Sequence, residues 1–259
     1  MIRFSTLKIT CLLIFSTLVS LAQTQDSTNT QAATTFSGSV GLTNNGFSII
    51  PTFSLNNPAV IMNFSWRKKR LSFDPDIRLV PDASKGGLLF WLRYRIIEKQ
   101  KFSLRLGTHP AFTLIHRNVT ENGKTTEITE MLRFLAFEIV PNYQITPNWG
   151  IGATYLQGNG LQNHGPQLTR VLFLNTNIAN IKLSENFRFQ LIPSVFFLYT
   201  DGYRGNYFSA TGILSNKKWP FALQSTINQT FKSDVPNNQN FMWNVMVSYN
   251  FSKKIMRIK

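Results

Sequence analysis

The stretch that decides the fold is GGLLFWLRYRIIEKQKFSLRLG, residues 86–107. Between residues 90 and 96 the apolar side chains fall at even positions, and Trp91, Arg93 and Arg95 fall at odd positions. A polar break at residues 98–101 leads to a second alternating segment, in which Arg105 lies opposite the apolar face. A period of two residues predicts two β-strands joined as a hairpin. One face of this hairpin is apolar and the other carries three arginines.

Two kinds of protein have strands with such faces. A soluble β-sandwich buries the apolar face, whereas a transmembrane β-barrel turns it to lipid and turns the polar face to its lumen. Charged residues make up 15% of the 259-residue chain, below the roughly 25% that is usual in soluble domains. Aromatic residues make up 13%. This composition fits a large lipid-facing surface, but it leaves an aromatic-rich sandwich open.

The N-terminus predicts export from the cytoplasm. Arg3 and Lys8 precede an apolar run at residues 9–21, and Ser20-Leu21-Ala22 supplies the small residues of a cleavage site. This pattern indicates a signal peptide at residues 1–22, too short for a stable membrane anchor. Residues 23–34 are polar and aperiodic, which predicts a flexible segment. The single cysteine lies inside the signal peptide, so the mature chain has no thiol chemistry.

The rest of the chain predicts a series of strands. Alternation recurs from residue 35 to residue 251, and it predicts twelve strands if residues 44–58 are an excursion rather than an extra hairpin. Short turns alternate with longer connections along the chain. In a barrel this would place the short turns at one end and the longer connections at the other. The longer connections are expected at residues 80–86, 118–125, 158–165, 201–205 and 232–240. Residues 252–259, SKKIMRIK, are expected to form a basic tail.

The chain therefore resembles the small single-chain outer-membrane β-barrel proteins of Gram-negative bacteria. The signal peptide, the alternating strands and the end of the last strand, VSYNF at residues 247–251, carry this resemblance. It implies an all-β, transmembrane, antiparallel up-and-down barrel at residues 35–251. It also implies that the insertion machinery of the outer membrane binds the last strand, although such barrels commonly end on the aromatic residue. An even number of strands would place both termini in the periplasm.

The predicted lumen face carries a set of charged residues. If residues 79 and 88 are aligned across the connection at 80–86, Asp74 lies opposite Arg93, and Arg105 lies near Arg93 across the next turn. These charges either tie the wall together or form a basic constriction that favours small anionic solutes. The candidates are Asp74, Asp76, Arg78, Arg93, Arg95, Arg105, Glu138 and Arg188. A twelve-stranded barrel is about 24 Å across, which predicts a narrow pore or a lumen plugged by arginines, Trp91 and an inward loop.

Aromatic side chains near strand ends predict contacts with the two membrane interfaces, where such residues are enriched. The candidates are Trp66, Tyr143, Trp149, Tyr199, Trp219, Trp243 and Phe251. Basic residues gather in the short turns and the tail, where we expect them to contact anionic lipid headgroups and not nucleic acid. Pro141 and Pro193 fall inside strands, where we expect bulges because proline removes a ladder donor.

These observations favour a passive role, either as a narrow, anion-leaning channel or as a structural component of the membrane. The alternatives are a barrel enzyme that acts on lipid or peptide and a soluble, exported β-sandwich that binds a ligand. Barrel phospholipases use a His-x-Ser pair, but His109, His116 and His164 are not followed by serine at that spacing. Asp74-Pro75-Asp76 provides paired aspartates without the Asp-x-His of barrel proteases. We expect no enzymatic activity, no metal and no cofactor.

Overall fold

A computed structural model describes residues 34–46, 48, 53–121 and 123–255 of the 259-residue chain. The predicted signal peptide, residues 23–33 and the last four residues lie outside this part. Within it, no helix has the length and apolar character needed to span a membrane.

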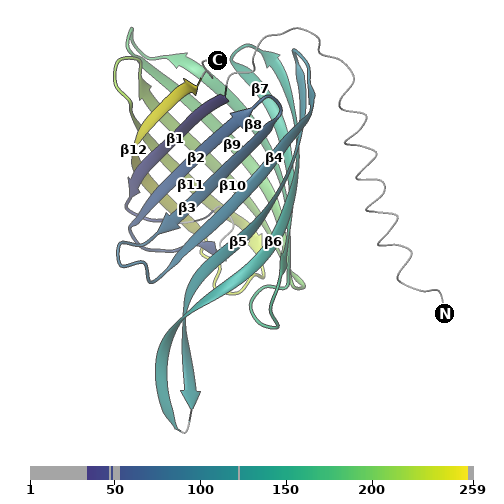
Figure 1. Ribbon diagram of the computed structural model, residues 1–259, viewed down its shortest axis with the longest axis vertical. Coiled ribbons are helices and arrows are strands. Elements are labelled where there is room, and N and C mark those ends of the chain that lie inside the picture. The colour runs from purple at the N-terminus through teal and green to yellow at the C-terminus, as the bar shows by residue number, and fades with distance from the viewer. Residues whose placement is uncertain (1–33, 47, 49–52, 122, 256–259) are drawn as a thin grey trace, which may run out of the picture. The chain divides into compact units, whose positions relative to one another are not determined.

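The described residues form twelve antiparallel strands in one closed barrel, which confirms the predicted fold class (Figure 1). Each strand pairs with its neighbours in sequence, and β1 pairs with β12. Closure leaves no free strand edge in the wall of the barrel itself. The strands are β1 (Thr34–Thr43), β2 (Ala59–Lys68), β3 (Leu71–Leu79), β4 (Gly86–Glu98), β5 (Phe102–Glu121), β6 (Lys124–Thr146), β7 (Trp149–Gly160), β8 (Leu168–Lys182), β9 (Phe187–Thr200), β10 (Tyr203–Asn216), β11 (Phe221–Ser233) and β12 (Phe241–Ile255).

The seam between β1 and β12 brings the two ends of the described chain together. Thr34 pairs with Ile255, and the ladder continues to Thr43 and Met246. Strand β12 therefore runs four residues beyond residue 251, because residues 252–255 find ladder partners in the first four residues of β1. We call the end of the barrel that holds Thr34 and Ile255 the terminal end, and the opposite end the distal end.

The outer face of the barrel is apolar. Large hydrophobic side chains remain exposed along the strands, including Leu92 and Tyr94 of β4 and Leu135 of β6. Around the seam, Phe36 stacks on Trp66 with ring centroids 4.6 Å apart and also contacts Phe251. A closed antiparallel sheet with this exterior has the surface that lipid solvates, and every backbone polar group within it has a ladder to join. The chain is a transmembrane β-barrel.

The predicted interface aromatics lie near both ends of this exterior. Trp66, Tyr143, Trp149, Trp219 and Phe251 lie toward the terminal end, whereas Tyr199 and Trp243 lie toward the distal end. The five tryptophan and tyrosine side chains Trp66, Tyr143, Trp149, Trp219 and Trp243 are exposed. Tyr199 and Phe251 are partly buried. Membrane barrels have aromatic side chains at such positions, and contact of these residues with the membrane interfaces stays a prediction.

The expected bulges at Pro141 and Pro193 are absent, so that prediction is wrong. Leu104 pairs with Pro141 and Ala210 pairs with Pro193 in unbroken registers. The ladder on the other side of each proline skips pairs without shifting its register. In an antiparallel strand each residue points its amide toward one neighbour only, so proline interrupts one ladder and leaves the other intact. The register shifts occur elsewhere, as between Ile178 and Ile181.

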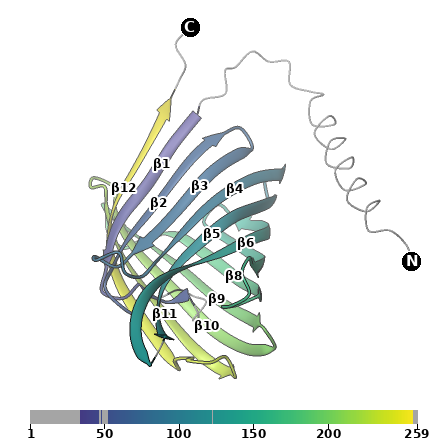
Figure 2. The same cartoon turned by 60° about the horizontal axis from the view of Figure 1, so that its bottom comes forward.

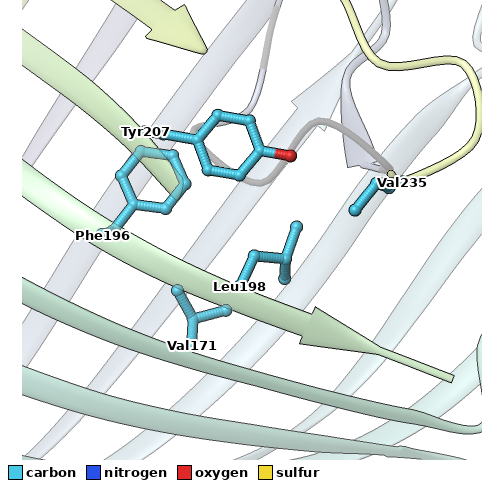
Figure 3. Packing of buried hydrophobic residues seen from close by; sticks show 5 residues of the cluster. All are labelled: Val171, Phe196, Leu198, Tyr207 and Val235. Atoms are coloured by element: carbon cyan, nitrogen blue, oxygen red, sulfur yellow. The ribbon is translucent and has the colours of Figure 1, made fainter. Parts of the chain in front are cut away.

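One side of the distal lumen is apolar, although the polar face of the strands was expected to line the lumen. Phe196 of β9 and Tyr207 of β10 stack with centroids 4.7 Å apart, and both are almost fully buried (Figure 3). Val171 and Leu198 line the wall beside them, and Val235 joins them from the connection between β11 and β12. This cluster fills one side of the lumen.

The connection between β1 and β2 turns into the lumen, and its described residues add no strand to the wall. Phe53 packs edge-on against Phe134 of β6 with centroids 5.6 Å apart, and it also contacts the cluster around Phe196. Leu55 is buried against Ala59 and Val80. Side chains from this connection therefore bridge opposite sides of the barrel and narrow its distal end.

The β5–β6 hairpin extends beyond the wall, where the sequence predicted a polar loop at residues 118–125. The β5–β6 ladder continues to Glu121 and Lys124, whereas the flanking strands stop pairing at Leu114 and Phe134. The result is a two-stranded projection (Figures 1 and 2). Side chains on both faces of its β6 arm are exposed at residues 124–129, so this part of the hairpin has no apolar face. The expected loop at residues 201–205 is likewise shorter, since β9 ends at Thr200 and β10 begins at Tyr203.

Replacing residues 118–127 by a two-residue Asn-Gly turn is expected to leave the barrel intact. The new turn would join Arg117 and Ile128, which are already ladder partners in phase with the hydrogen-bonded pair of Lys101 and Gln144, and Asn-Gly favours the closure of such a pair. The free energy of unfolding should change by less than about 1 kcal/mol, as for most surface changes. Denaturant unfolding and the heat-modifiable gel mobility of the folded barrel measure this. A larger loss would mean that the projection packs against the distal end and stabilises it.

Candidate functional site in the barrel lumen

Alternation along four neighbouring strands brings charged side chains to one patch of the inner wall. Asp74 of β3, Arg93 of β4, Arg105 of β5 and Glu138 of β6 all occupy inward positions, since the residues beside each of them in the sequence face lipid. Leucine, tyrosine and phenylalanine at the intervening positions keep these strands in register, because a shift of one residue would turn the charges to lipid. We call these four side chains the charge cluster.

Arg93 is the centre of the charge cluster. Its Nη1 atom donates to Oδ2 of Asp74 at 3.1 Å, and its Nε atom donates to Oε1 of Glu138 at 2.8 Å. Arg105 contacts the same Glu138 oxygen at 3.1 Å through Nη2. The Arg93 guanidinium also lies over the ring of Trp91, 4.3 Å from its centroid. Two carboxylates and the Trp91 ring therefore hold the Arg93 guanidinium in place.

Small residues support these ion pairs. Ser65 and Ser72 donate hydroxyl hydrogen bonds to Asp74, at 2.5 and 2.9 Å. A Cβ atom at Gly107 would lie 2.8 Å from Cγ of Glu138 and 3.1 Å from Cγ of Arg93. Glycine at this position therefore gives the two side chains room to meet. The cluster is built into the wall from five neighbouring strands, β2 to β6.

Four predicted lumen residues lie outside the charge cluster. Asp76 and Arg78 form their own pair at 2.6 Å on β3. Arg95 contacts Glu98, which the sequence analysis did not select. Arg188 donates instead to the backbone carbonyls of Ser184, Glu185 and Phe187 near the terminal end.

The predicted register between β3 and β4 is wrong by two residues. Asp74 pairs with Trp91, and Arg93 pairs with Ser72. The connection is six residues long, from residue 80 to residue 85, because Gly86 already pairs with Leu79. A shift of two residues keeps every side chain on its face, and the long Arg93 side chain reaches Asp74 diagonally. The contact therefore forms although the pairing differs.

The charges within these ion pairs balance. In the charge cluster two guanidinium groups face two carboxylates, and Asp76–Arg78 and Arg95–Glu98 are matched pairs. These arginines therefore do not form a ring of unpaired positive charge, because each one has a carboxylate partner. The arrangement has the form of a brace between strands.

Next to the brace, the lumen contains a cavity of about 330 Å³. Its lining comes mainly from the inner faces of β3 to β8 and from Phe53 and Leu55 of the inward connection. Aromatic side chains line much of it, namely Trp91, Phe134 and Phe173, with Phe53 at the distal side. The polar groups at its surface include Arg78, Asp76, Arg93 and His109. The lumen is narrowed but not filled.

The cavity exists because the inner wall has small residues at this level. Ala111, Ala136 and Gly158 lie on adjacent strands, where larger side chains would fill the space. A Cβ atom at Gly158 would meet only the Cβ of Ala136, at 3.8 Å. The space in front of Gly158 is therefore open. The sequence analysis missed these residues, although their parity along β5, β6 and β7 places them on the lumen face.

His109 is a further lumen residue that was not among the candidates selected from the sequence. It is buried, and its ring lies against Trp91 with centroids 3.8 Å apart. Its Nδ1 atom is buried and makes no hydrogen bond with the described residues. Its odd position in β5, in phase with Arg105 and Gly107, was the signal that could have placed it in the lumen.

The other two histidines lie at the distal end. His116 contacts Glu127 on the projecting hairpin, and His164 contacts Glu130 from the connection between β7 and β8. Arg117 pairs with the same Glu130 at 3.0 Å. Among the residues that the structure describes, no group of three histidine, cysteine or acidic side chains is placed to hold a metal ion.

Neither a protein-family model nor a curated protein sequence matches the chain. Solved structures with a similar fold include a KdgM porin, with 11% sequence identity over 83% of this chain and 99% of that one and a TM-score of 0.49. The β domain of the Bordetella autotransporter BrkA has 11% identity over 85% and 99% of the two chains, with a TM-score of 0.46. LpxR from Salmonella typhimurium has 10% identity over 83% and 100%, also with a TM-score of 0.46. Similarities this low give no information on activity.

Proposed function

We propose that this chain is an outer-membrane β-barrel that acts as a narrow passive channel. The observation that carries the proposal is the open cavity inside a closed, lipid-solvated barrel. A barrel whose only role is structural has no need of inward glycine and alanine residues that leave space in its lumen. Passage requires groups that bind solutes weakly, and the mixed polar and aromatic lining offers such groups.

The lengths of the connections support an orientation of the barrel in the membrane. At the terminal end the strands are joined by short turns of two to four residues, as between Lys68 and Leu71. The connections at residues 44–58, 161–167 and 234–240 are longer and lie at the distal end. Outer-membrane barrels carry short turns in the periplasm and longer loops outside the cell. We therefore place the terminal end, with both termini of the mature chain, in the periplasm.

The anion preference is assigned to arginines near the terminal mouth and not to the charge cluster. Arg67 of β2 and Arg188 of β9 occupy inward positions near this end, and neither forms an ion pair with a described acidic side chain. A single sign of charge at a pore mouth attracts counter-ions and raises their local concentration. Arg93 contributes little to such a field because two carboxylates neutralise it together with Arg105.

Replacing both Arg67 and Arg188 by glutamate is expected to convert a modest anion preference into a cation preference. The measurement is the reversal potential of single channels in planar bilayers under a potassium chloride gradient. A matched control replaces Lys69 and Lys218 by glutamate, because both are exposed and lie in turns at the same end, outside the strands of the wall. The control should change the reversal potential little. An unchanged preference in the Arg67/Arg188 variant would contradict this assignment of the selectivity.

A structural role is the second candidate, because Phe53 and the cluster around Phe196 obstruct the distal lumen. Absence of conductance over a range of salt concentrations would favour it. We propose no catalytic role, since each histidine is engaged by an aromatic ring or a glutamate in the described structure. Recovery of the protein in the soluble periplasm, without heat-modifiable mobility, would refute the membrane assignment as a whole.

A further inference from the structure

We propose that the lumen cavity is a binding site for neutral one- or two-ring aromatic compounds that carry a hydroxyl group. The binding itself follows from the cavity, whereas transport of the ligand would rest on the proposed channel function. Three properties of the described residues carry the inference: the size and shape of the space, the charge balance of its wall, and two polar groups without full hydrogen bonding.

The size suits a small ring system. A cavity of about 150 Å³ takes benzene, and typical ligand pockets begin at about 300 Å³. The cavity here is about 330 Å³. Trp91, Phe134 and Phe173 border it, and such rings prefer stacked or edge-on contacts with another aromatic ring. The small side chains of Ala111 and Ala136, together with Gly158, form a surface against which a planar molecule can lie.

The charge balance favours a neutral ligand over an anion. Asp76, Arg78 and Arg93 are charged side chains of the lining, and each has a partner of opposite charge within the wall. A carboxylate would bring an unmatched charge into a largely apolar space, which carries a large desolvation cost. A sugar would leave many hydroxyl groups without partners against the aromatic wall. A neutral ring with one hydroxyl group avoids both problems.

Two polar groups can hold that hydroxyl group. Arg78 donates to Asp76 through Nε and Nη2, which leaves Nη1 without a hydrogen bond to the described residues. Because the contact with Asp76 already holds the guanidinium in place, a hydrogen bond from Nη1 to a ligand would cost little side-chain entropy. His109 supplies an imidazole on the cavity surface, held against Trp91. A hydroxyl group can accept from Arg78 and can donate to or accept from His109.

The test is equilibrium dialysis of the full mature chain, refolded in detergent micelles, with para-hydroxybenzyl alcohol as the probe. A ligand of this size should bind with a dissociation constant of about 0.1–1 mM. Ala136→Leu and Gly158→Leu fill the cavity and should each weaken binding by about tenfold or more. Ala222→Leu is the matched control, because Ala222 faces the lumen from β11 and does not line the cavity. It should bind as the unmodified chain does.

Two filling variants are used in case one of them misfolds. If Ala136→Leu distorts β6, Gly158→Leu still tests the cavity, since the space in front of Gly158 is free. Equal binding by the unmodified chain and both filling variants would overturn the proposal, because the probe would then be in the micelle or at another site. Tighter binding of para-hydroxybenzoate or sucrose than of the alcohol would overturn the assignment of a neutral aromatic ligand. A barrel that conducts ions and does not bind the probe refutes this inference alone. A barrel that binds the probe and conducts nothing refutes the channel alone.

Discussion

Glu138→Gln is expected to destabilise the barrel by about 3–5 kcal/mol, the range for breaking one side of a buried ion pair. Glu138 is 5% exposed and accepts from both Arg93 and Arg105. The amide removes one negative charge and leaves two guanidinium groups close together with only Asp74 to balance them. Arg105 is 34% exposed and will be partly solvated, so the effect should lie toward the lower end of that range.

Denaturant unfolding of the refolded barrel measures this effect, and two further variants make it specific. Glu98→Gln breaks the Arg95 contact, but Glu98 is 45% exposed, so the loss should stay below about 1 kcal/mol. Combining Glu138→Gln with Arg105→Gln restores the charge balance and should recover part of the lost stability. If Glu138→Gln costs no more than Glu98→Gln, lumen water solvates the cluster and it does not brace the wall.

Phe53→Ala is expected to raise the single-channel conductance several-fold. Phe53 projects from the inward connection and contacts both Phe134 of β6 and the cluster around Phe196 on β8 to β10. Removing its ring opens space at the narrowed distal end, where an apolar constriction excludes water and ions. Planar-bilayer recordings of the two proteins under the same salt conditions measure the change.

Phe90→Ala is the matched control for this prediction. Phe90 also packs edge-on against a phenylalanine, Phe112, with centroids 6.2 Å apart, but this pair lies on the lipid face. Both variants lose one aromatic pair, worth about 0.5–1.5 kcal/mol, and only Phe53→Ala changes the lumen. Equal conductance in both variants and the unmodified chain would contradict the assignment of Phe53 to the constriction.

The strands were predictable because every one of them crosses the same lipid layer and therefore follows the same pattern. Each span must alternate between lipid and lumen, so the hairpin at residues 86–107 already contains the pattern that the other strands repeat. The charged residues of the lumen face followed from the same parity. Even an error of two residues in the register between β3 and β4 preserved the faces, since only an odd shift exchanges them.

What the sequence did not predict depends on contacts across the lumen. Phe53 and Leu55 lie in a segment without alternation, and their inward position is determined by partners such as Phe134 and Val80 on distant strands. The cavity depends on which small residues lie side by side, and this requires the registers of β5, β6 and β7 together. Phe196 and Leu198 lie on the same inward face of β9 as Arg188 and Gln190. The polar residues at the start of this face indicated a polar lumen, although its far end is apolar.

The seam between β1 and β12 differs from every other ladder in the sequence distance that it closes. Thr43 donates to the carbonyl of Val245 across 202 positions of sequence, whereas every other ladder joins strands that follow each other. By the loop-closure relation, a tenfold longer loop costs about 2 kcal/mol more in chain entropy. Eleven ladders can therefore form as local hairpins, and the seam has by far the greatest contact order. Strand β12, the last strand of the described chain, completes the cylinder, so a chain without it would have two open strand edges and no enclosed lumen.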